Sequence, residues 1–412
     1  MAFASGKKRG TRAVSRTASR PPQKQTNRRR KKARKAQRLQ ALLSKNSYTR
    51  RVYGWYEQEK EKRADSPLLL VTVMLLAIGL IALLSASYPK AYYSSSTGPF
   101  YYFIRQTMFA AVGLALMYVV SCIPYWKYKR WALHLYVLSI ILLIVVLTPL
   151  GTSLNNSQRW LFGFQPSEIA KLAAKNPKSV HRVKDLMFYA LLVALLIGLL
   201  ALEPHMSAAM IITVVAFSIL FVAGMKVWFL VPLTGAGIAI IVLAYFNLSH
   251  VHSRLKVFLD PFSDARNKGY QIVQSLIAIG SGGPFGLGLG QSRQKFLYLP
   301  EPFNDFIFSV VCEELGFIGA TLILGLFAFF VYRGFSIARR AGSRFGAFLA
   351  TGITMQFAFQ ILLNLAVVTG LFPVTGASLP MFSYGGTALV MQMLEIGILL
   401  NISRNIPPSK KQ

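Results

Sequence analysis

The sequence predicts an all-α polytopic membrane protein, and three observations carry that prediction. The chain has 412 residues, of which 54% are hydrophobic and 15% are charged, too few charges to cover the surface of a soluble protein. The hydrophobic residues gather into runs long enough to cross a bilayer. Residues 1–65 contain 21 of the 46 Lys and Arg residues but only 4 of the 14 acids. This composition excludes a collagen-like, disulfide-rich or ordinary cytosolic protein.

The basic residues at the start of the chain form a separate segment, 1–64, with no hydrophobic pattern over most of its length. We expect this segment to be a disordered cytoplasmic tail. Basic clusters such as Arg28–Lys32 are typical of segments that contact anionic lipid, an interpretation we favour over nucleic-acid binding. The transmembrane domain is predicted at 65–405, followed by a short cytoplasmic tail at 406–412.

Nine apolar runs within that domain are long enough to be transmembrane helices. Glu203-Pro204-His205 divides the long run at 186–224 into two, because it places a charge and a helix breaker at its centre. The nine runs are 66–87, 100–124, 130–150, 186–203, 207–224, 227–247, 305–332, 345–372 and 381–402.

The distribution of basic residues requires a tenth crossing. With the basic tail inside, the positive-inside rule also places Arg339, Arg344 and Arg404 inside, and nine spans would put the two ends of the domain on opposite sides. The missing crossing falls near 169–176, where about eight residues span only about 12 Å of a core about 30 Å thick. We therefore expect ten helices, the fourth truncated.

One long extracytoplasmic loop, 248–304, contains many of the remaining polar residues. Its basic residues, among them Arg254, Arg293 and Lys295, lie on the side that the rule disfavours, which indicates an anionic ligand unless they are only solvated. The glycine-rich stretch 280–290 lacks the strand and helix of a nucleotide site, so it favours close backbone packing or a re-entrant turn.

Three acids lie at or within the apolar helix that follows the loop. Asp305 stands at its start, where an acid serves either a reaction or the N-terminal cap, and spacing alone does not separate the two. Glu313 and Glu314 lie inside the apolar run, where a structural ion pair is the favoured interpretation. The histidines lack the HExxH spacing of a metalloprotease, and no metal-ligand set is predicted.

Several polar and glycine-containing motifs follow one another along the chain. They are Gln165-Pro166-Ser167-Glu168-Ile169-Ala170-Lys171, Tyr270–Leu276, Leu299-Pro300-Glu301, Asn304–Phe308, Glu313–Gly319 and Leu379–Gly386. In this order they resemble the motifs of the SEDS family (shape, elongation, division and sporulation), over about 66–405. The stretch 288–295 is more similar to the division and sporulation branch, FtsW and SpoVE, than to the elongation branch, RodA.

The resemblance implies a ten-helix enzyme that polymerises lipid II into glycan strands outside the plasma membrane, together with a class B penicillin-binding protein. Asp305 matches the essential Asp of the family, and Arg159-Trp160 matches its Arg-Trp pair. Further substrate contacts are expected from motif residues Lys171, Gln274, Ser275, Glu301 and Ser383. Two departures stand out: Phe303-Asn304 replaces the usual His-Thr pair before the Asp, and the fourth helix is cut short.

The hypothetical mechanism is an inverting displacement with Asp305 as the base. Arg293, Lys295, Arg254 and Arg159 would stabilise the pyrophosphate, with Mg²⁺ or another divalent cation as the expected cofactor and no organic cofactor. Trp160 would stack on a sugar or anchor at the interface.

The expected location is the bacterial plasma membrane, with both termini cytoplasmic, at the division septum among other divisome proteins. The alternatives are a lipid II flippase, which would use charges at mid-bilayer, and a non-catalytic divisome scaffold.

Overall fold

The computed structural model describes residues 64–93, 98–146, 152–154, 157–160, 192–200, 206–224, 228, 257–267 and 269–406. Several predictions lie outside these residues: the N-terminal tail, the truncated fourth crossing with Lys171, the span at 227–247, Arg254, and the C-terminal residues 407–412. Every described residue belongs to one compact unit, Arg63–Gln412.

The described part of the chain is helical, which confirms the predicted fold class. Among the described residues, five helices are long and apolar enough to cross a membrane, namely α3, α4, α12, α13 and α14, and α8 is a shorter apolar helix. Their bounds are α3 Ser66–Tyr93, α4 Tyr101–Cys122, α5 Tyr128–Val146, α8 Met206–Val222, α11 Tyr270–Ser281, α12 Ile307–Arg340, α13 Arg344–Val368 and α14 Gly386–Arg404. The described residues also include two single-turn helices, η2 Tyr125–Lys127 and η4 Pro261–Asp264, and a helical segment at 192–200.

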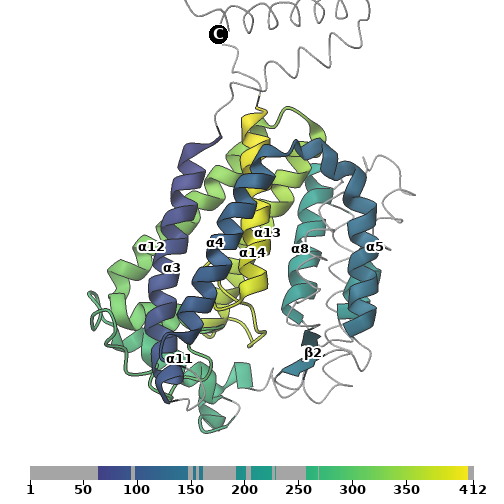
Figure 1. The fold of residues 1–412 in the computed structure, drawn as a ribbon. Helices are drawn as coiled ribbons and strands as arrows, with labels where there is room; N and C mark the ends of the chain where they lie inside the picture. The colour runs from purple at the N-terminus through teal and green to yellow at the C-terminus, as the bar shows by residue number, and fades with distance from the viewer. Residues whose placement is uncertain are drawn as a thin grey trace, which may run out of the picture. The chain divides into compact units, whose positions relative to one another are not determined.

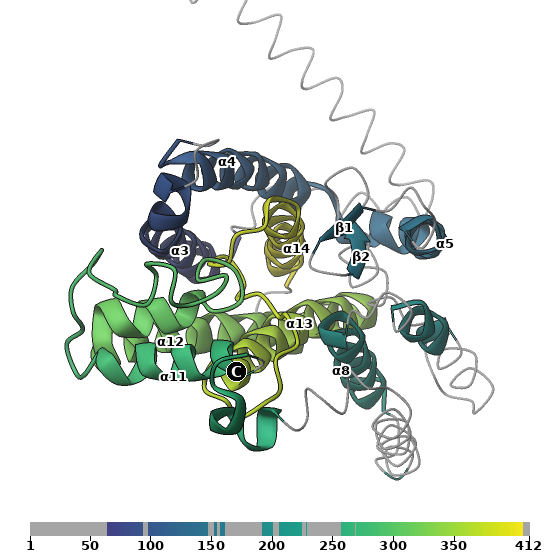
Figure 2. The same cartoon turned by 90° about the horizontal axis from the view of Figure 1, so that it is seen from below.

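The helices pack as a bundle in which α14 lies against α4 and α13, while α12 lies against α3, α11 and α13 (Figure 2). The helix α8 packs on α13 (Figure 1). Glycine allows α14 and α4 to approach closely, because a Cβ at Gly397 of α14 would lie 2.6 Å from the Met117 carbonyl oxygen of α4. Small residues are the usual means of bringing transmembrane helices together.

The first and last described helices meet at the same end of the bundle. The backbone N–H of Asp65, just before α3, donates to Ser403 Oγ near the end of α14 at 3.0 Å. The Asp65 carboxylate accepts from the Leu68 N–H of α3 at 3.0 Å and from Arg333 Nε of α12 at 3.2 Å. The start of α3 and the end of α14 therefore lie on the same side of the bundle, as the distribution of basic residues predicts.

The described residues of the predicted loop 248–304, which are 257–267 and 269–304, include regular structure. The loop contains η4 and α11, and the latter buries Ile272, Val273, Ser275 and Ala278, a helix that the sequence analysis did not predict. A short antiparallel hairpin, β1 Thr152–Leu154 with β2 Ser157–Trp160, is the only sheet within the described ranges. Figure 1 shows α11 and β2 at the end of the bundle opposite the start of α3.

Candidate active site

Asp305 lies in the turn that leads into α12. The helix begins at Ile307 and Phe306 stands at its N-cap position, so Asp305 lies one residue before the cap, half-buried. A negative charge close to a helix N-terminus is stabilised by the unpaired N–H groups and the helix dipole there. The position suits an ionised carboxylate.

The backbone on both sides of this carboxylate is fixed by three successive hydrogen bonds. The carbonyl oxygen of Phe303 accepts from the Tyr384 N–H at 2.9 Å. The carbonyl of Asn304 accepts from Ser383 Oγ at 2.7 Å, and that of Asp305 accepts from Asn364 Nδ2 at 2.7 Å. The turn that carries Asp305 is thus attached to α13 and to the segment between α13 and α14.

Buried amide side chains from three helices hold that segment in turn. Gln106 of α4 donates to the Ser383 carbonyl at 3.3 Å and accepts from the Gly385 N–H at 3.2 Å. Gln392 of α14 accepts from the Met381 N–H at 3.0 Å. Asn364 of α13 donates to the Ala377 carbonyl at 2.7 Å as well as to Asp305. A buried amide that satisfies backbone groups fixes their geometry, because leaving them unpaired is costly.

On the outer side of the turn, Glu301 links it to the end of α3. Glu301 Oε1 forms an ion pair with Lys90 Nζ at 3.2 Å, and Glu301 Oε2 accepts from Asn304 Nδ2 at 2.5 Å. The Lys90 ammonium also lies 5.1 Å from the centre of the Phe303 ring. Glu301, predicted as a substrate contact, is therefore joined to the two residues that precede Asp305.

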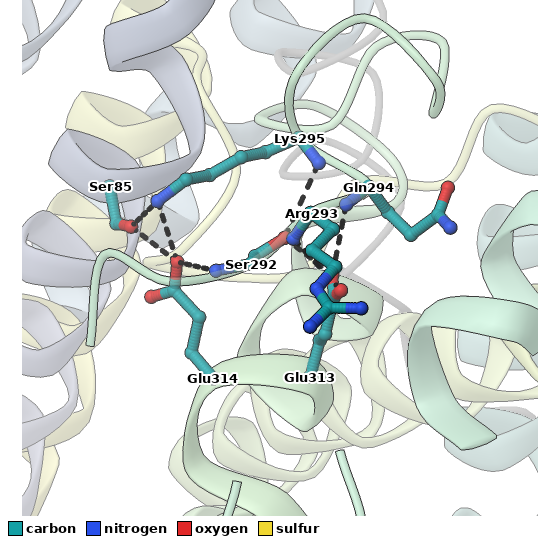
Figure 3. A network of polar contacts seen from close by, with 7 residues as sticks. All are labelled: Ser85, Ser292, Arg293, Gln294, Lys295, Glu313 and Glu314. Atoms are coloured by element: carbon teal, nitrogen blue, oxygen red, sulfur yellow. Dashed lines mark hydrogen bonds and ion pairs between the residues drawn. The ribbon is translucent and has the colours of Figure 1, made fainter. Parts of the chain in front are cut away.

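A second polar network joins residues 292–295 to α3 and α12, and Figure 3 shows its members. Lys295 Nζ contacts Glu314 Oε1 and Ser85 Oγ, both at 2.8 Å, and Ser85 Oγ donates to the same carboxylate oxygen at 2.6 Å. The Lys295 and Glu314 side chains are only 4% and 3% exposed. The prediction of a structural ion pair is confirmed for Glu314. Lys295 is predicted to contact the pyrophosphate, but here its ammonium is paired with the Glu314 carboxylate.

The neighbouring carboxylate organises the loop backbone. Glu313 accepts a hydrogen bond from Ser292 Oγ, another from the Arg293 N–H at 2.9 Å and a third from the Gln294 N–H at 3.3 Å (Figure 3). The Arg293 side chain itself is exposed. Of the two basic residues within 269–304, Arg293 is therefore the one whose guanidinium remains accessible to a ligand.

The glycine-rich stretch packs its backbone directly on a break in α12. At Gly316 (φ 66°, ψ −169°) the helix is interrupted, so the N–H groups of Phe317 and Ile318 bond instead to the Gly283 and Pro284 carbonyls at 2.8 and 3.1 Å. In an unbroken helix those two N–H groups would bond to the carbonyls of Glu313 and Glu314. These carbonyls instead accept from the Leu287 and Gly288 N–H groups, both at 3.0 Å. The loop thus replaces the missing helical hydrogen bonds one for one. Close backbone packing, as predicted, is confirmed.

Two further predicted residues lie on α11. Ser275 is buried, where its Oγ lies 2.7 Å from Ser309 Oγ and donates to the Val368 carbonyl at 2.6 Å. It therefore joins α11 to α12 and α13. Gln274, beside it, is half-buried. Arg159 and Trp160 lie in β2, and their side chains are outside the described part of the structure.

The sequence analysis missed one basic residue near this turn. Arg105 of α4 is exposed, and its Nη1 donates to Tyr101 Oη at 3.0 Å. Burial raises the pKa of the Tyr384 hydroxyl, and the Arg105 charge opposes that rise. Tyr384 also contacts the Phe303 ring, with 6.0 Å between centroids. A charge inside the apolar run 100–124 is the signal that could have identified Arg105.

Within the described ranges, no group of three or more His, Cys, Asp and Glu side chains is arranged to hold a metal ion. The site is thus defined by one half-buried carboxylate on a braced turn, at the α11 end of a bundle of apolar helices. The class of protein is a polytopic membrane protein with a half-buried carboxylate just before the start of one of its long apolar helices.

The family model described as "Cell cycle protein", that of FtsW, RodA and SpoVE, matches residues 66–407. Stage V sporulation protein E of Bacillus subtilis (strain 168) is 39% identical over 366 residues, covering 84% of this chain and 98% of the relative. The probable peptidoglycan glycosyltransferase FtsW of Trichlorobacter lovleyi is 40% identical over 357 residues, covering 83% and 93%.

Solved structures agree with this assignment. A chain from the structure titled "Structural coordination of polymerization and crosslinking by a peptidoglycan synthase complex" matches with a TM-score of 0.71 and 27% identity, covering 84% of this chain and 99% of the other. RodA of Thermus thermophilus matches with a TM-score of 0.59 and 27% identity, covering 83% and 97%. The chain belongs to the FtsW, RodA and SpoVE family, the SEDS proteins, as its motifs predict.

Proposed function

We propose that this membrane protein is a peptidoglycan glycosyltransferase that polymerises lipid II, with Asp305 as its general base. Family membership supports the activity, since relatives of about this length carry that name. The observation that supports Asp305 is the bracing of its turn, in which three consecutive carbonyls are each held by a separate partner. A base must keep a fixed position relative to the proton it removes.

The proposed step is a single inverting displacement. The acceptor's 4-hydroxyl oxygen attacks the anomeric carbon of the donor while its proton passes to the Asp305 carboxylate. The bond between that carbon and the pyrophosphate oxygen breaks, and undecaprenyl pyrophosphate leaves with the electron pair. One carboxylate is sufficient, because inversion at an activated donor needs no covalent intermediate and no second acid for the leaving group.

The leaving pyrophosphate requires positive charge nearby. Arg293 is the predicted cation that the described structure leaves accessible, and Arg105 on α4 is a second candidate. The predicted roles of Arg159 and Arg254 remain proposals. Mg²⁺ would be held chiefly by the phosphates, as is usual for this ion, because the described residues build no cluster of ligands. The displacement described above does not depend on it.

The proposed orientation places Asp305 outside the cell. Arg333 and Arg340 lie at the Asp65 end of the bundle, together with Arg339 and Arg344 at the α12–α13 turn. By the positive-inside rule this end is cytoplasmic. The opposite end, with α11 and the Asp305 turn, then faces the outer surface, where lipid II is polymerised.

The proposed partner is a class B penicillin-binding protein. One solved relative comes from a complex that couples polymerization and crosslinking, which supports a transpeptidase partner here. Service at the division septum with other divisome proteins, in division or in sporulation, is proposed from the family branch.

The test is polymerisation of fluorescent lipid II by the full chain in proteoliposomes, with and without the transpeptidase. Asp305→Asn should lower the rate by about 10²- to 10⁴-fold, the usual contribution of a general base. The matched control is Asp260→Asn, where Asn can still cap η4 as Asp260 does through Ser263 N–H. Polymerisation at the wild-type rate by Asp305→Asn would refute the assignment. Translocation of lipid II without glycan products would favour a flippase, and activity of neither kind a scaffold.

A further inference from the structure

The loop 282–298, between α11 and the Asp305 turn, has an inverted polarity. Its hydrophilic side chains Ser292 and Lys295 are buried against Glu313 and Glu314. Its large apolar side chains are exposed instead: Phe285 79%, Leu287 38%, Leu289 59%, Phe296 44%, Leu297 65% and Tyr298 57%. A loop in water would expose the first set and bury the second, because exposed contiguous apolar surface is rare outside interaction sites.

Most backbone N–H groups of this loop are hydrogen-bonded within the protein. Within 286–296, every N–H group except those of Leu289 and Gly290 donates to a protein oxygen. The acceptors include both carboxylates, which take the N–H groups of Ser292, Arg293 and Gln294. Internal satisfaction of the backbone is what irregular chain requires at membrane depth, where water is scarce.

The loop backbone lies directly against α12, whose exposed side chains near the break are also large and apolar. Phe317, directly after the helix break, is 72% exposed in a helix long and apolar enough to span the membrane. Its N–H bonds to the Gly283 carbonyl at 2.8 Å, and a Cβ on Gly316 would lie 2.7 Å from the Phe285 carbonyl carbon. The backbone of Phe285 therefore lies beside the break that precedes Phe317, and both side chains are exposed.

We propose that the loop 282–298 is an interfacial membrane element, with its apolar side chains seated among the outer-leaflet lipids. Aromatic and aliphatic side chains on one surface with satisfied backbone behind them are the features of an interfacial anchor. Arg293, which is exposed on the same loop, then lies at the depth of the headgroups. That consequence rests on the proposed function, because the headgroup of interest is the pyrophosphate of a lipid-linked sugar.

The test is the accessibility of nitroxide labels in proteoliposomes of phosphatidylethanolamine and phosphatidylglycerol. Single cysteines replace Leu289 and Leu297 in a Cys122→Ser background, because Cys122 is the exposed one of the two free cysteines. Leu322→Cys on α12, where Leu322 is 67% exposed, is the lipid reference. Asn267→Cys, on the exposed polar turn after η4, is the water reference.

We expect the labels at 289 and 297 to collide with oxygen, which partitions into lipid, and to be shielded from a water-soluble nickel chelate, as at 322. A water-like response, as at 267, would overturn the proposal. So would shielding from both reagents, which would show a protein cover. Polymerase activity of each labelled protein is recorded separately, so loss of fold or of the proposed activity is distinguishable from a wrong loop placement. Leu297 has a positive φ of 68°. If labelling at 297 perturbs the protein, the result at 289 alone decides the test.

Discussion

Removal of the buried Lys295 ammonium is the sharpest energetic test of the polar network behind the loop. Lys295→Met leaves the Glu314 carboxylate buried with only the neutral donors Ser85 Oγ and Ser292 N–H. Breaking one side of a buried ion pair costs about 3–5 kcal/mol of unfolding free energy. Because two donors remain, we expect a loss of about 3 kcal/mol, at the lower end of that range.

A double variant tests whether Lys295 and Glu314 are energetically coupled. Glu314→Gln alone leaves Lys295 buried without its carboxylate and should cost a similar amount. Lys295→Met with Glu314→Gln removes both charges, so its cost should fall below the sum of the two single costs by at least about 2 kcal/mol. The measurement is equilibrium unfolding in mixed detergent micelles, followed by tryptophan fluorescence.

The control for this cycle is Arg293→Met, a cation on the same loop whose side chain is exposed. Its unfolding free energy should change by less than about 0.5 kcal/mol, as for ordinary surface substitutions. Single costs for Lys295→Met and Glu314→Gln that add within about 0.5 kcal/mol would refute a coupled buried pair.

Three further changes test other parts of the site. Gly286→Ala would place a Cβ 2.1 Å from the Glu314 carbonyl oxygen at a φ of +81° and should lower both stability and polymerisation, whereas Gly280→Ala meets nothing within 4 Å and should change neither. Asn364→Leu leaves the Asp305 and Ala377 carbonyls without their donor and should cost about 1–3 kcal/mol, with a fall in kcat rather than a rise in KM; unchanged kcat would contradict the bracing role. Lys90→Met breaks a partly exposed ion pair with Glu301, so the unfolding free energy should fall by less than about 1 kcal/mol, and a larger loss would contradict that classification.

Hydropathy and the placement of charges together predict the number of membrane crossings. Hydropathy alone locates nine runs, and the placement of basic residues on one side makes the total even. The hydrogen bond between Asp65 and Ser403 places the start of α3 and the end of α14 together, as that argument requires. Such rules succeed because the bilayer imposes the same cost on every chain that crosses it.

The helix α11 and the break in α12 were not predictable in the same way. Residues 270–281 read as loop because they are too short to span a bilayer, and Gly316 reads as an ordinary residue of an apolar run. The break is stable only because the Leu287 and Gly288 N–H groups and the Gly283 and Pro284 carbonyls exchange partners with α12. A sequence pattern does not contain such pairings, which join segments about 30 residues apart.

The sequence by itself determined the membrane class, the family, the spans that the structure describes and Asp305 as the candidate base, because lipid-buried helices have an apolar composition and the family motifs recur in a fixed order. The tertiary structure decided which charges are available to a ligand. Lys295 and Arg293 look alike two residues apart, yet Lys295 is buried against Glu314 while Arg293 is exposed. Availability depends on what a side chain meets from distant parts of the chain, and here the break at Gly316 brings both glutamates of α12 against the loop.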